Sequence, residues 1–472
     1  MESYRDKRKP VQKLWSMKAL QMSMLVMAVV FNMTNTPYSF GAVSPEEATK
    51  LGTALTGIGA EKAGNKEGTI PEYTGVMPTP PPNFKPGSGV YPDPFADEKP
   101  LFSINAQNMI RYADKLTEGT TALMKRYPTF RIDIYKTHRT VVFPDSVIKN
   151  TAKNALRATT GNNGLSVKGA RAGVPFPIPK DGYEVMWNHL MRFQGRAWTS
   201  HTVTDLITSD GTVVAAGGGT FWQEFPYYDE DISRFDANYY WKVRWFFDRP
   251  VRTTGEVGQI FDPINPYETK RIAYQYLPGQ RRVKLAPELK FDTPNPEACG
   301  QTTFDEPWGF MGSMERYDMK LIGKKEFYVP YNTYRATFTS PKSDLLGPKH
   351  INPDILRWEL HRMWVVEGTL KPGKRHIYPK RRFYLDEDSW YLVASDVYDA
   401  HGHFFKVIYV PPTPRYDAPV PIANYCLHYN LINFSYVSSL WPGEEAGGYV
   451  RLAAPLPERF WSPHTMAGTG VR

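Results

Sequence analysis

Apolar and polar residues alternate with a period of two through most of the second half of the chain. The segment 239–248 is typical, because Trp241, Trp245 and Phe247 share one parity while Lys242 falls on the other. Such alternation predicts β-strands with unlike faces. The predicted strands are 198–208, 212–224, 239–248, 271–277, 281–285, 358–370, 377–386, 390–398, 404–410 and 425–436.

The connections between these strands are short and rich in turn residues, such as Ser209-Asp210-Gly211, Pro278-Gly279 and Lys371-Pro372-Gly373. Short connections force neighbouring strands to run antiparallel. Helical spacing is confined to the earlier part of the chain. The predicted helices are 103–126, 145–159 and 182–193, with one strand at 131–143. We therefore expect a mainly β (α+β) fold, a large curved antiparallel sheet or unclosed β-barrel wrapped around a few helices.

The first 42 residues have the order of a secretory signal peptide. Six basic residues precede the uncharged apolar run 19–31, and small residues follow at Ser39, Gly41 and Ala42. This order predicts cleavage and a soluble mature protein in the periplasm. A single-pass anchor is the alternative, although the run is short for a membrane span.

Residues 43–100 are polar and then proline-rich, with PTPPP at 78–82. Such a segment is extended. It is either a free linker or a strap that aromatic residues pin to the body, and residues 101–472 then form the β-domain.

Charge and composition exclude several classes of protein. The net charge is +9, but without residues 1–42 it falls to +5, with 51 basic and 46 acidic residues. No basic run remains that would bind nucleic acid. A hydrophobic content of 41% excludes an integral membrane bundle, and aromatic residues are abundant at 14%. Cys299 and Cys426 are the only cysteines. In an oxidising compartment we expect them to form a disulfide, with two separate buried thiols as the alternative.

Sequence signals for catalysis are weak. No GxSxG, P-loop or dinucleotide motif is present. His401-Gly402-His403, near Asp396 and Asp399, is either a zinc site or a solvated turn, and we prefer the turn. His361 and His376 stand alone in predicted strands, and Asp386-Glu387-Asp388 is interpreted as a charged turn. We expect no enzyme activity, cofactor or metal.

Two stretches resemble known families. Residues 276–283, YLPGQRRV, and 309–319, GFMGSMERYDM, resemble a paired signature of outer-membrane lipoprotein-sorting proteins. Residues 364–390, with 59–65 and 68–71, resemble a family of large exported Gram-negative proteins distantly related to them. The resemblance implies an open barrel with a hydrophobic hollow for acyl chains. It also implies association with inner-membrane exporters of hydrophobic compounds.

We therefore expect non-covalent binding and shuttling of a lipid or other hydrophobic molecule, with peripheral membrane contact. The alternatives are a secreted metal-dependent hydrolase using His401 and His403, and a structural envelope protein whose core is filled by its own side chains. Arg281 and Arg282 are surface charges or headgroup ligands, and we prefer the first. The residues expected to line the cavity are Trp241, Trp245, Phe247, Tyr276, Phe310, Trp358 and Trp364.

Overall fold

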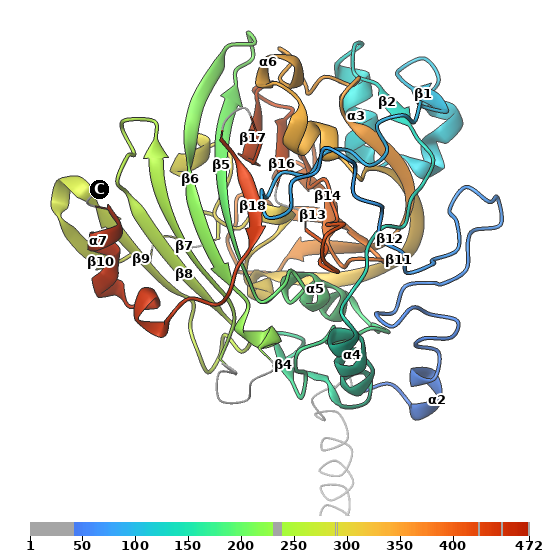
Figure 1. Cartoon of the computed structure of the whole chain (residues 1–472), viewed down its shortest axis with the longest axis horizontal. Helices are drawn as coiled ribbons and strands as arrows, with labels where there is room; N and C mark the ends of the chain where they lie inside the picture. Colours follow the sequence, from blue (N-terminus) through green and yellow to red (C-terminus); the bar gives the residue numbers. More distant parts are fainter. Residues whose placement is uncertain are drawn as a thin grey trace, which may run out of the picture. The chain divides into compact units, whose positions relative to one another are not determined.

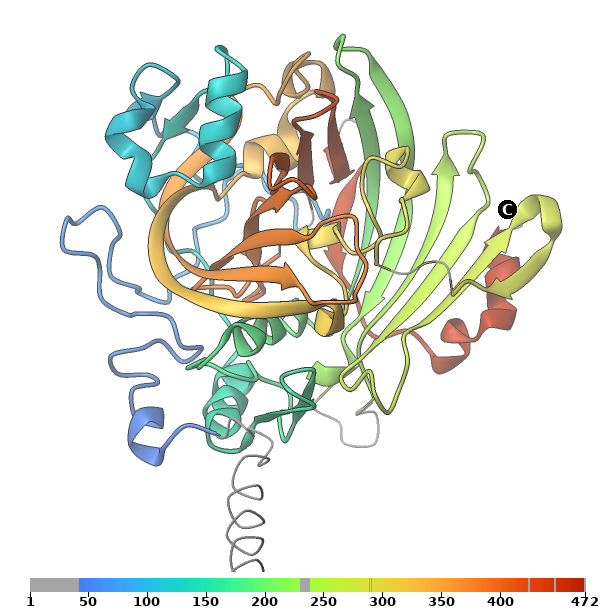
Figure 2. The ribbon, with the colours of Figure 1, turned by 180° about the vertical axis from the view of Figure 1, so that it is seen from behind.

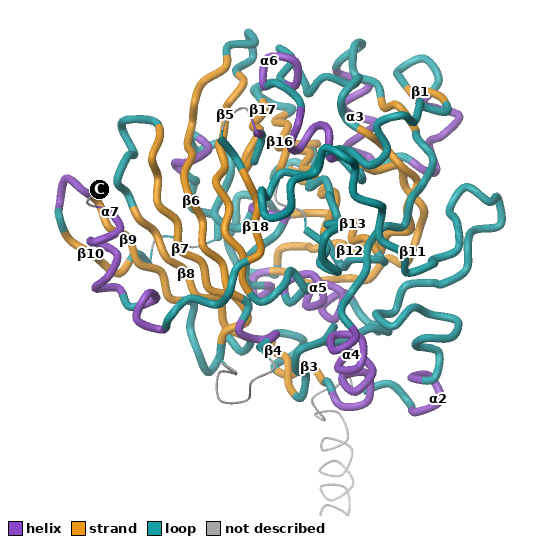
Figure 3. Tube along the Cα trace, viewed as in Figure 1, coloured by secondary structure: helices purple, strands orange, loops and turns teal. Residues whose placement is uncertain are grey.

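A computed structural model describes residues 42–229, 238–287, 289, 291–422, 425–444 and 447–470, so the predicted signal peptide lies almost wholly outside the described residues. Strands dominate and helices are short (Figure 3). The helices are α2 (Pro45–Ala48), α3 (Glu118–Arg126), α4 (Asp145–Arg157), α5 (Gly182–Leu190), α6 (Lys342–Leu345) and α7 (Met466–Gly470). Strands β3 (Thr159–Gly161) and β4 (Ser166–Lys168) form a separate pair.

The remaining strands form one large open sheet (Figure 1). Within the described ranges the sheet has 16 strands. They are β1 (Phe102–Ile104), β2 (Ile132–Ile134), β5 (Ala197–Ile207), β6 (Val213–Glu224), β7 (Tyr239–Arg249), β8 (Val257–Pro263), β9 (Ile272–Leu277), β10 (Arg282–Leu285), β11 (Tyr317–Pro330), β12 (Arg357–Leu370), β13 (Lys380–Asp386), β14 (Leu392–Tyr398), β15 (Phe404–Tyr409), β16 (Cys426–Asn430), β17 (Tyr436–Trp441) and β18 (Tyr449–Leu452).

The strand order is β1-β2-β12-β13-β14-β15-β16-β17-β5-β6-β7-β8-β9-β10, with β11 along the other side of β12 and β18 beside β5. From β11 to β10 every neighbour is antiparallel, and β2 alone runs parallel to β12. Strands β11 to β15 curl away from the broad wall of β5 to β10, which leaves the barrel unclosed (Figures 1 and 2). The predicted fold class is confirmed.

Several predicted elements differ from the structure. The helix expected over 103–126 divides into β1, a 3-10 turn at Met109–Lys115 and α3, and the strand expected over 131–143 is reduced to β2. Strands β3, β4, β8, β11, β17 and β18 were not predicted, and the strand expected over 425–436 ends at Asn430 as β16. In β11 a bulge between Leu321 and Gly323 shifts the parity of the side chains, so a strict period of two does not detect it.

The proline-rich segment is a strap. The Tyr73 hydroxyl donates to the Val141 carbonyl at 2.8 Å. Farther along, Phe95 stacks on His138 with ring centroids 4.2 Å apart. Tyr91, which is buried, packs against Tyr416. The aromatic residues therefore pin the segment to loops of the β-domain, and the free-linker alternative is wrong.

The connection between β10 and β11 crosses the inner side of the sheet (yellow in Figure 2). Its 3-10 turn η4 (Pro296–Ala298) contacts β5 and β6, and η5 (Pro307–Gly309) contacts β14 and β16. Two buried ion pairs anchor its second half, since Asp305 lies 2.7 Å from Arg381 and Glu306 lies 2.8 Å from Lys406. Much of the hollow is thus filled by the chain itself.

Over the part of the chain that the structure describes, none of the helices combines the length and the apolar character that crossing a bilayer requires.

Candidate functional site: an aromatic cavity under the η4 loop

A small cavity lies between the wall of β6 to β8 and the segment 291–304, which we call the η4 loop. We call this space the aromatic cavity. Its volume is about 70 Å³, and a second cavity of about 50 Å³ adjoins it through Trp245. The lining side chains of the aromatic cavity include Phe221, Trp241, Val243, Trp245 and Ile260 from the wall, Glu297, Ala298 and Phe304 from the loop, and Trp308 just beyond it.

Alternation along β7 directs its aromatic residues into this space. Trp241 packs edge-on against Trp308 with ring centroids 5.8 Å apart, and its Nε1 donates to Gln223 at 2.8 Å. Trp245 lies flat across β8, where a Cβ at Gly258 would come within 1.9 Å of the indole. The glycine therefore makes room for the tryptophan, and these side chains form one apolar surface.

The η4 loop approaches β6 closely because Gly217 has no side chain. A Cβ at this position would lie 2.5 Å from Cγ of Glu297. Burial raises the pKa of Glu297 to about 7, although a hydrogen bond from Thr204 opposes this. Within the described ranges, Oε1 of Glu297 and Nε1 of Trp308 are buried without a hydrogen-bond partner. The boundary between loop and wall therefore contains polar atoms that a sealed core would satisfy.

The structure places Trp241 and Trp245 in the lining of the aromatic cavity and Phe247 in that of the adjoining one. Tyr276 lies on the opposite face of the sheet, where Met466 of α7 covers it. The expectation that it lines the same hollow is wrong, because β9 joins β8 in a register that turns Tyr276 outward beside Val257.

The other three residues also lie outside the aromatic cavity. Phe310 is fully buried against Phe383, and Trp358 is buried against Tyr409. Trp364 stacks on Trp390, with ring centroids 6.1 Å apart. The prediction of one shared cavity is therefore wrong for these three. Phe310 belongs to the packed connection between β10 and β11, and β12, which carries Trp358 and Trp364, is covered on both faces. Arg281 and Arg282 are exposed, as preferred from the sequence.

The expected disulfide is not formed in the structure. Cys299 is exposed, with its Sγ 3.7 Å from Nη2 of Arg252. Cys426 is fully buried in β16, and burial raises the pKa of its thiol to about 12. The two side chains belong to different environments, one at the surface and one in the core, and this corrects the prediction.

The His401-Gly402-His403 turn brings Asp399 near His403, with Oδ2 3.5 Å from Nδ1, but does not bring Asp396 there. Both histidines are exposed, and their backbone N–H groups donate to the Asp399 carboxylate at 2.8 Å. Asp396 is instead buried and accepts a hydrogen bond from the Tyr384 hydroxyl at 2.8 Å. The preferred interpretation, a solvated turn, agrees with this geometry.

A different set of residues was missed. The turn Asp386-Glu387-Asp388 is buried, and His361 of β12 lies beside it. One potential ligand atom from each of His361, Asp386 and Asp388 lies within 4.8 Å of the other two. Burial and the neighbouring Asp388 raise the pKa of Asp386 to about 6. The sequence held one signal for this burial. Large apolar residues flank the turn on both sides, at Phe383-Tyr384-Leu385 and at Trp390-Tyr391.

Comparison with known proteins identifies the family. The chain is 38% identical over 442 residues to the uncharacterized protein PA3922 of Pseudomonas aeruginosa, covering 91% of this chain and 95% of that protein. A DUF1329 family structure from Desulfovibrio piger matches with a TM-score of 0.39 and 12% identity, over 57% of this chain and 91% of its own. The LolA superfamily protein NE2245 from Nitrosomonas europaea matches with a TM-score of 0.35 and 8% identity, over 60% of this chain and 98% of its own.

The family described as "Protein of unknown function (DUF1329)" matches residues 103–467. The resemblance inferred from the sequence motifs is confirmed at the level of the family, and the chain belongs to the DUF1329 family.

Proposed function

We propose that the protein binds an apolar molecule, such as the acyl chain of a lipid, non-covalently against the aromatic wall of β6 to β8. The observation that carries the proposal is the aromatic cavity, where Trp241, Trp245 and Phe221 face a loop instead of a continuous core. The unpaired Oε1 of Glu297 at this boundary favours a cover that separates from the wall. The role proposed is that of a binding protein and not of an enzyme.

Binding requires the η4 loop to move. The cavity of about 70 Å³ is several-fold smaller than ligand pockets, which occupy roughly 300–1,000 Å³. The loop closes on itself, since Asn295 N–H donates to the Thr302 carbonyl at 2.8 Å. The buried ion pairs of Asp305 and Glu306 fix the chain directly after it. We expect the loop to move outward as a unit while the following segment stays in place, which breaks the hydrogen bond from Lys406 to the Gln301 carbonyl and the ion pair between Asp292 and Arg316.

The proposed location is the periplasm, on the strength of the basic, apolar and small-residue order of the first 42 residues. We expect N-terminal sequencing of the mature protein to begin near Val43. An intact Met1 on membrane-bound protein would support an anchor. Delivery of the bound molecule to or from an inner-membrane exporter is part of the proposal and depends on the family resemblance.

The test compares two tryptophans on opposite faces of the same wall. Trp245 faces the cavity, whereas Trp222 packs against Phe460 on the outer face, with ring centroids 5.6 Å apart. We expect Trp245→Ala to remain folded and to lose most of its affinity for a fluorescent fatty acid. Trp222→Ala is the matched control and should bind as the wild type does.

Circular dichroism confirms the folding of each variant. Equal binding by wild type and Trp245→Ala would contradict the proposal. So would equal losses in both variants, because the effect would then not depend on the face of the sheet.

A further inference from the structure

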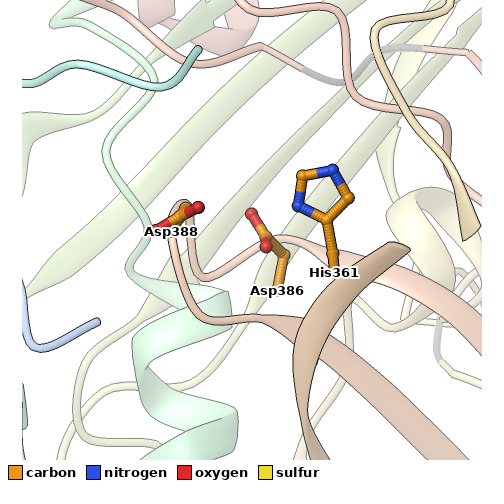
Figure 4. Close-up of side chains that lie close together, drawn as sticks. All are labelled: His361, Asp386 and Asp388. Atoms are coloured by element: carbon orange, nitrogen blue, oxygen red, sulfur yellow. The ribbon is translucent and has the colours of Figure 1, made fainter. Parts of the chain in front are cut away.

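Three potential metal ligands meet in the interior, away from the aromatic cavity. His361 comes from β12, while Asp386 and Asp388 come from the turn between β13 and β14 (Figure 4). Their exposed fractions are 1%, 0% and 3%. One nitrogen or oxygen from each lies within 4.8 Å of the others. Figure 4 shows Asp386 between the other two side chains.

His361 is oriented through its far ring nitrogen. Its Nε2 lies 3.2 Å from Oε2 of Glu359, and the ring stacks on Tyr331 at 3.8 Å. Glu359 is itself held by Arg357 at 2.5 Å and by Asn332 at 3.0 Å. Nε2 therefore carries the proton, and the lone pair of Nδ1 is available to bind a metal. Figure 4 shows Nδ1 on the side of the ring that faces Asp386. A carboxylate that orients a histidine in this way is the usual outer support of a metal-binding imidazole.

Asp386 supplies the second, independent observation. Its Oδ2 accepts hydrogen bonds from the Tyr331 hydroxyl at 2.9 Å and the Ser389 hydroxyl at 2.5 Å. Its Oδ1 is buried and has no hydrogen-bond partner among the described residues. A buried carboxylate oxygen without a partner is unfavourable, and a cation would satisfy it.

Among the described residues, the surrounding cations pair with Asp388 and Glu387 and not with Asp386. Arg139 contacts both oxygens of Asp388, at 2.7 and 2.8 Å. Lys324 pairs with Glu387 at 2.8 Å, and Arg362 pairs with the same carboxylate at 3.3 Å. Within the described ranges no Lys or Arg forms an ion pair with Asp386. Each Asp388 oxygen keeps a second lone pair, so Asp388 remains able to bind a cation.

We propose that His361 Nδ1, Asp386 Oδ1 and an oxygen of Asp388 bind one divalent transition-metal ion of the zinc class. Zinc takes imidazole nitrogen at about 2.0–2.1 Å and carboxylate oxygen at about 2.0–2.2 Å. In a tetrahedral site two such ligands lie roughly 3.4 Å apart. A set within 4.8 Å therefore reaches this geometry when the side chains draw together by up to about 1.4 Å. The three ligands leave a fourth position for water or a neighbouring hydroxyl.

The ion would stabilise the attachment of the strap. Arg139, which binds Asp388, also donates to the carbonyls of Glu61 at 2.7 Å and Lys62 at 3.2 Å. Glu61 N–H in turn donates to Glu387 at 3.3 Å. Fixing Asp388 by a metal therefore fixes the guanidinium that holds residues 61–62 over the turn. The proposal is independent of apolar-ligand binding.

The experiment measures zinc bound by full-length mature protein after dialysis against a chelator. We expect isothermal titration with Zn²⁺ to give one site per chain, and the melting temperature to rise with zinc. Asp386→Asn and His361→Gln should each weaken this site at least 100-fold and abolish the thermal shift. Glu359→Gln should weaken it by about 10–100-fold, as expected for an orienting partner.

Two controls retain the site. Asp396→Asn alters another buried carboxylate of the same sheet, bonded to Tyr384 and Gly119. His403→Ala removes the exposed histidine turn. Absence of zinc binding in the wild type would overturn the proposal. So would a site that survives His361→Gln and disappears in His403→Ala, because the metal would then bind at the exposed turn. If Asp386→Asn does not fold, His361→Gln decides.

Discussion

Replacing Glu297 by Gln tests whether the η4 loop covers a carboxyl group in the aromatic cavity. Glu297 lies against β6 at Gly217, and burial raises its pKa from 4.5 to about 7. A glutamine has nearly the same shape and is never ionised. The substitution therefore removes the charge and keeps the packing of the loop.

The magnitude follows from the gap between the folded and unfolded pKa values. A difference of one pKa unit corresponds to 1.36 kcal/mol, so moving from 4.5 to about 7 corresponds to about 3 kcal/mol. Because the folded pKa is the higher one, the folded protein binds the proton more tightly. The contribution of Glu297 to stability is therefore complete below pH 4.5 and is lost as the pH rises through about 7. The value of about 3 kcal/mol is an upper limit. If the loop swings outward, water hydrates the carboxylate, and the free-energy difference becomes smaller.

The assay is urea unfolding of wild type and Glu297→Gln at pH 5 and pH 8. We expect the variant to be more stable by about 1 kcal/mol or less at pH 5 and by up to about 3 kcal/mol at pH 8. His428 also lines the cavity, but burial lowers its pKa to about 4, so it stays neutral at both pH values. Glu256 of the adjoining cavity is present in both proteins. Its contribution to the pH dependence of stability therefore cancels when the two proteins are compared.

Glu458→Gln, which neutralises an exposed carboxylate, controls for the change in net charge. If the stability difference between wild type and Glu297→Gln is the same at both pH values, the carboxyl group is hydrated in the folded state. The η4 loop would then not seal the cavity, and the reasoning about a movable cover would be refuted.

Three further predictions concern the packed interior. Phe310→Ala should reduce the free energy of unfolding by about 3–5 kcal/mol in urea titrations, whereas Trp245→Ala should reduce it less because one face of its ring borders a cavity. Burial tends to raise the pKa of Asp305, but Arg381 outweighs it and holds this pKa well below its usual range. Calorimetry should therefore show that the ionised Asp305 stabilises the protein above pH 3.8 and that this stabilisation is lost at lower pH. Asp305→Asn should destabilise by about 3–5 kcal/mol, since Arg381 is left buried and unpaired. Alkylation of denatured, unreduced protein should label both Cys299 and Cys426, and a single disulfide-protected species would contradict the structure.

The sheet could be predicted because its strands carry a local signal. The alternation in β7 and the turns around Gly211 and Gly279 depend on neighbouring residues alone, and the structure places strands there. The same period of two correctly assigned Trp241 and Trp245 to the inner face. Parity relates the residues within one strand only. It does not relate one strand to another, so Tyr276 was assigned to the wrong face.

The buried charged cluster had no such local signal. His361 and Asp386 are 25 residues apart, and they meet because β12 and β13 pair with Met363 opposite Asp386. An acidic triplet between strands is usually exposed to solvent. Asp386-Glu387-Asp388 was therefore predicted to be an exposed charged turn, whereas the structure buries it. The strap and the side chains of Arg139 and Lys324 cover and neutralise the turn. Arg139 is 249 residues from Asp388 and Lys324 is 63 residues from Glu387, so local pattern does not reveal these contacts.

The division of the β10–β11 connection explains how one open sheet can be both packed and able to bind a ligand. After Thr303 the chain carries Trp308, Phe310 and Met311 into the core, and Asp305 and Glu306 lock it there through Arg381 and Lys406. An apolar ligand could not displace this part without breaking buried ion pairs, which is strongly unfavourable. The preceding η4 loop is polar and proline-rich, as a surface connection would be, and its ion pair between Asp292 and Arg316, at 2.8 Å, is partly exposed to solvent. A ligand therefore competes with the contacts of this loop, which include the hydrogen bond from Lys406 Nζ to the Gln301 carbonyl at 2.8 Å. The filled part of the hollow provides the rigid floor against which the ligand binds.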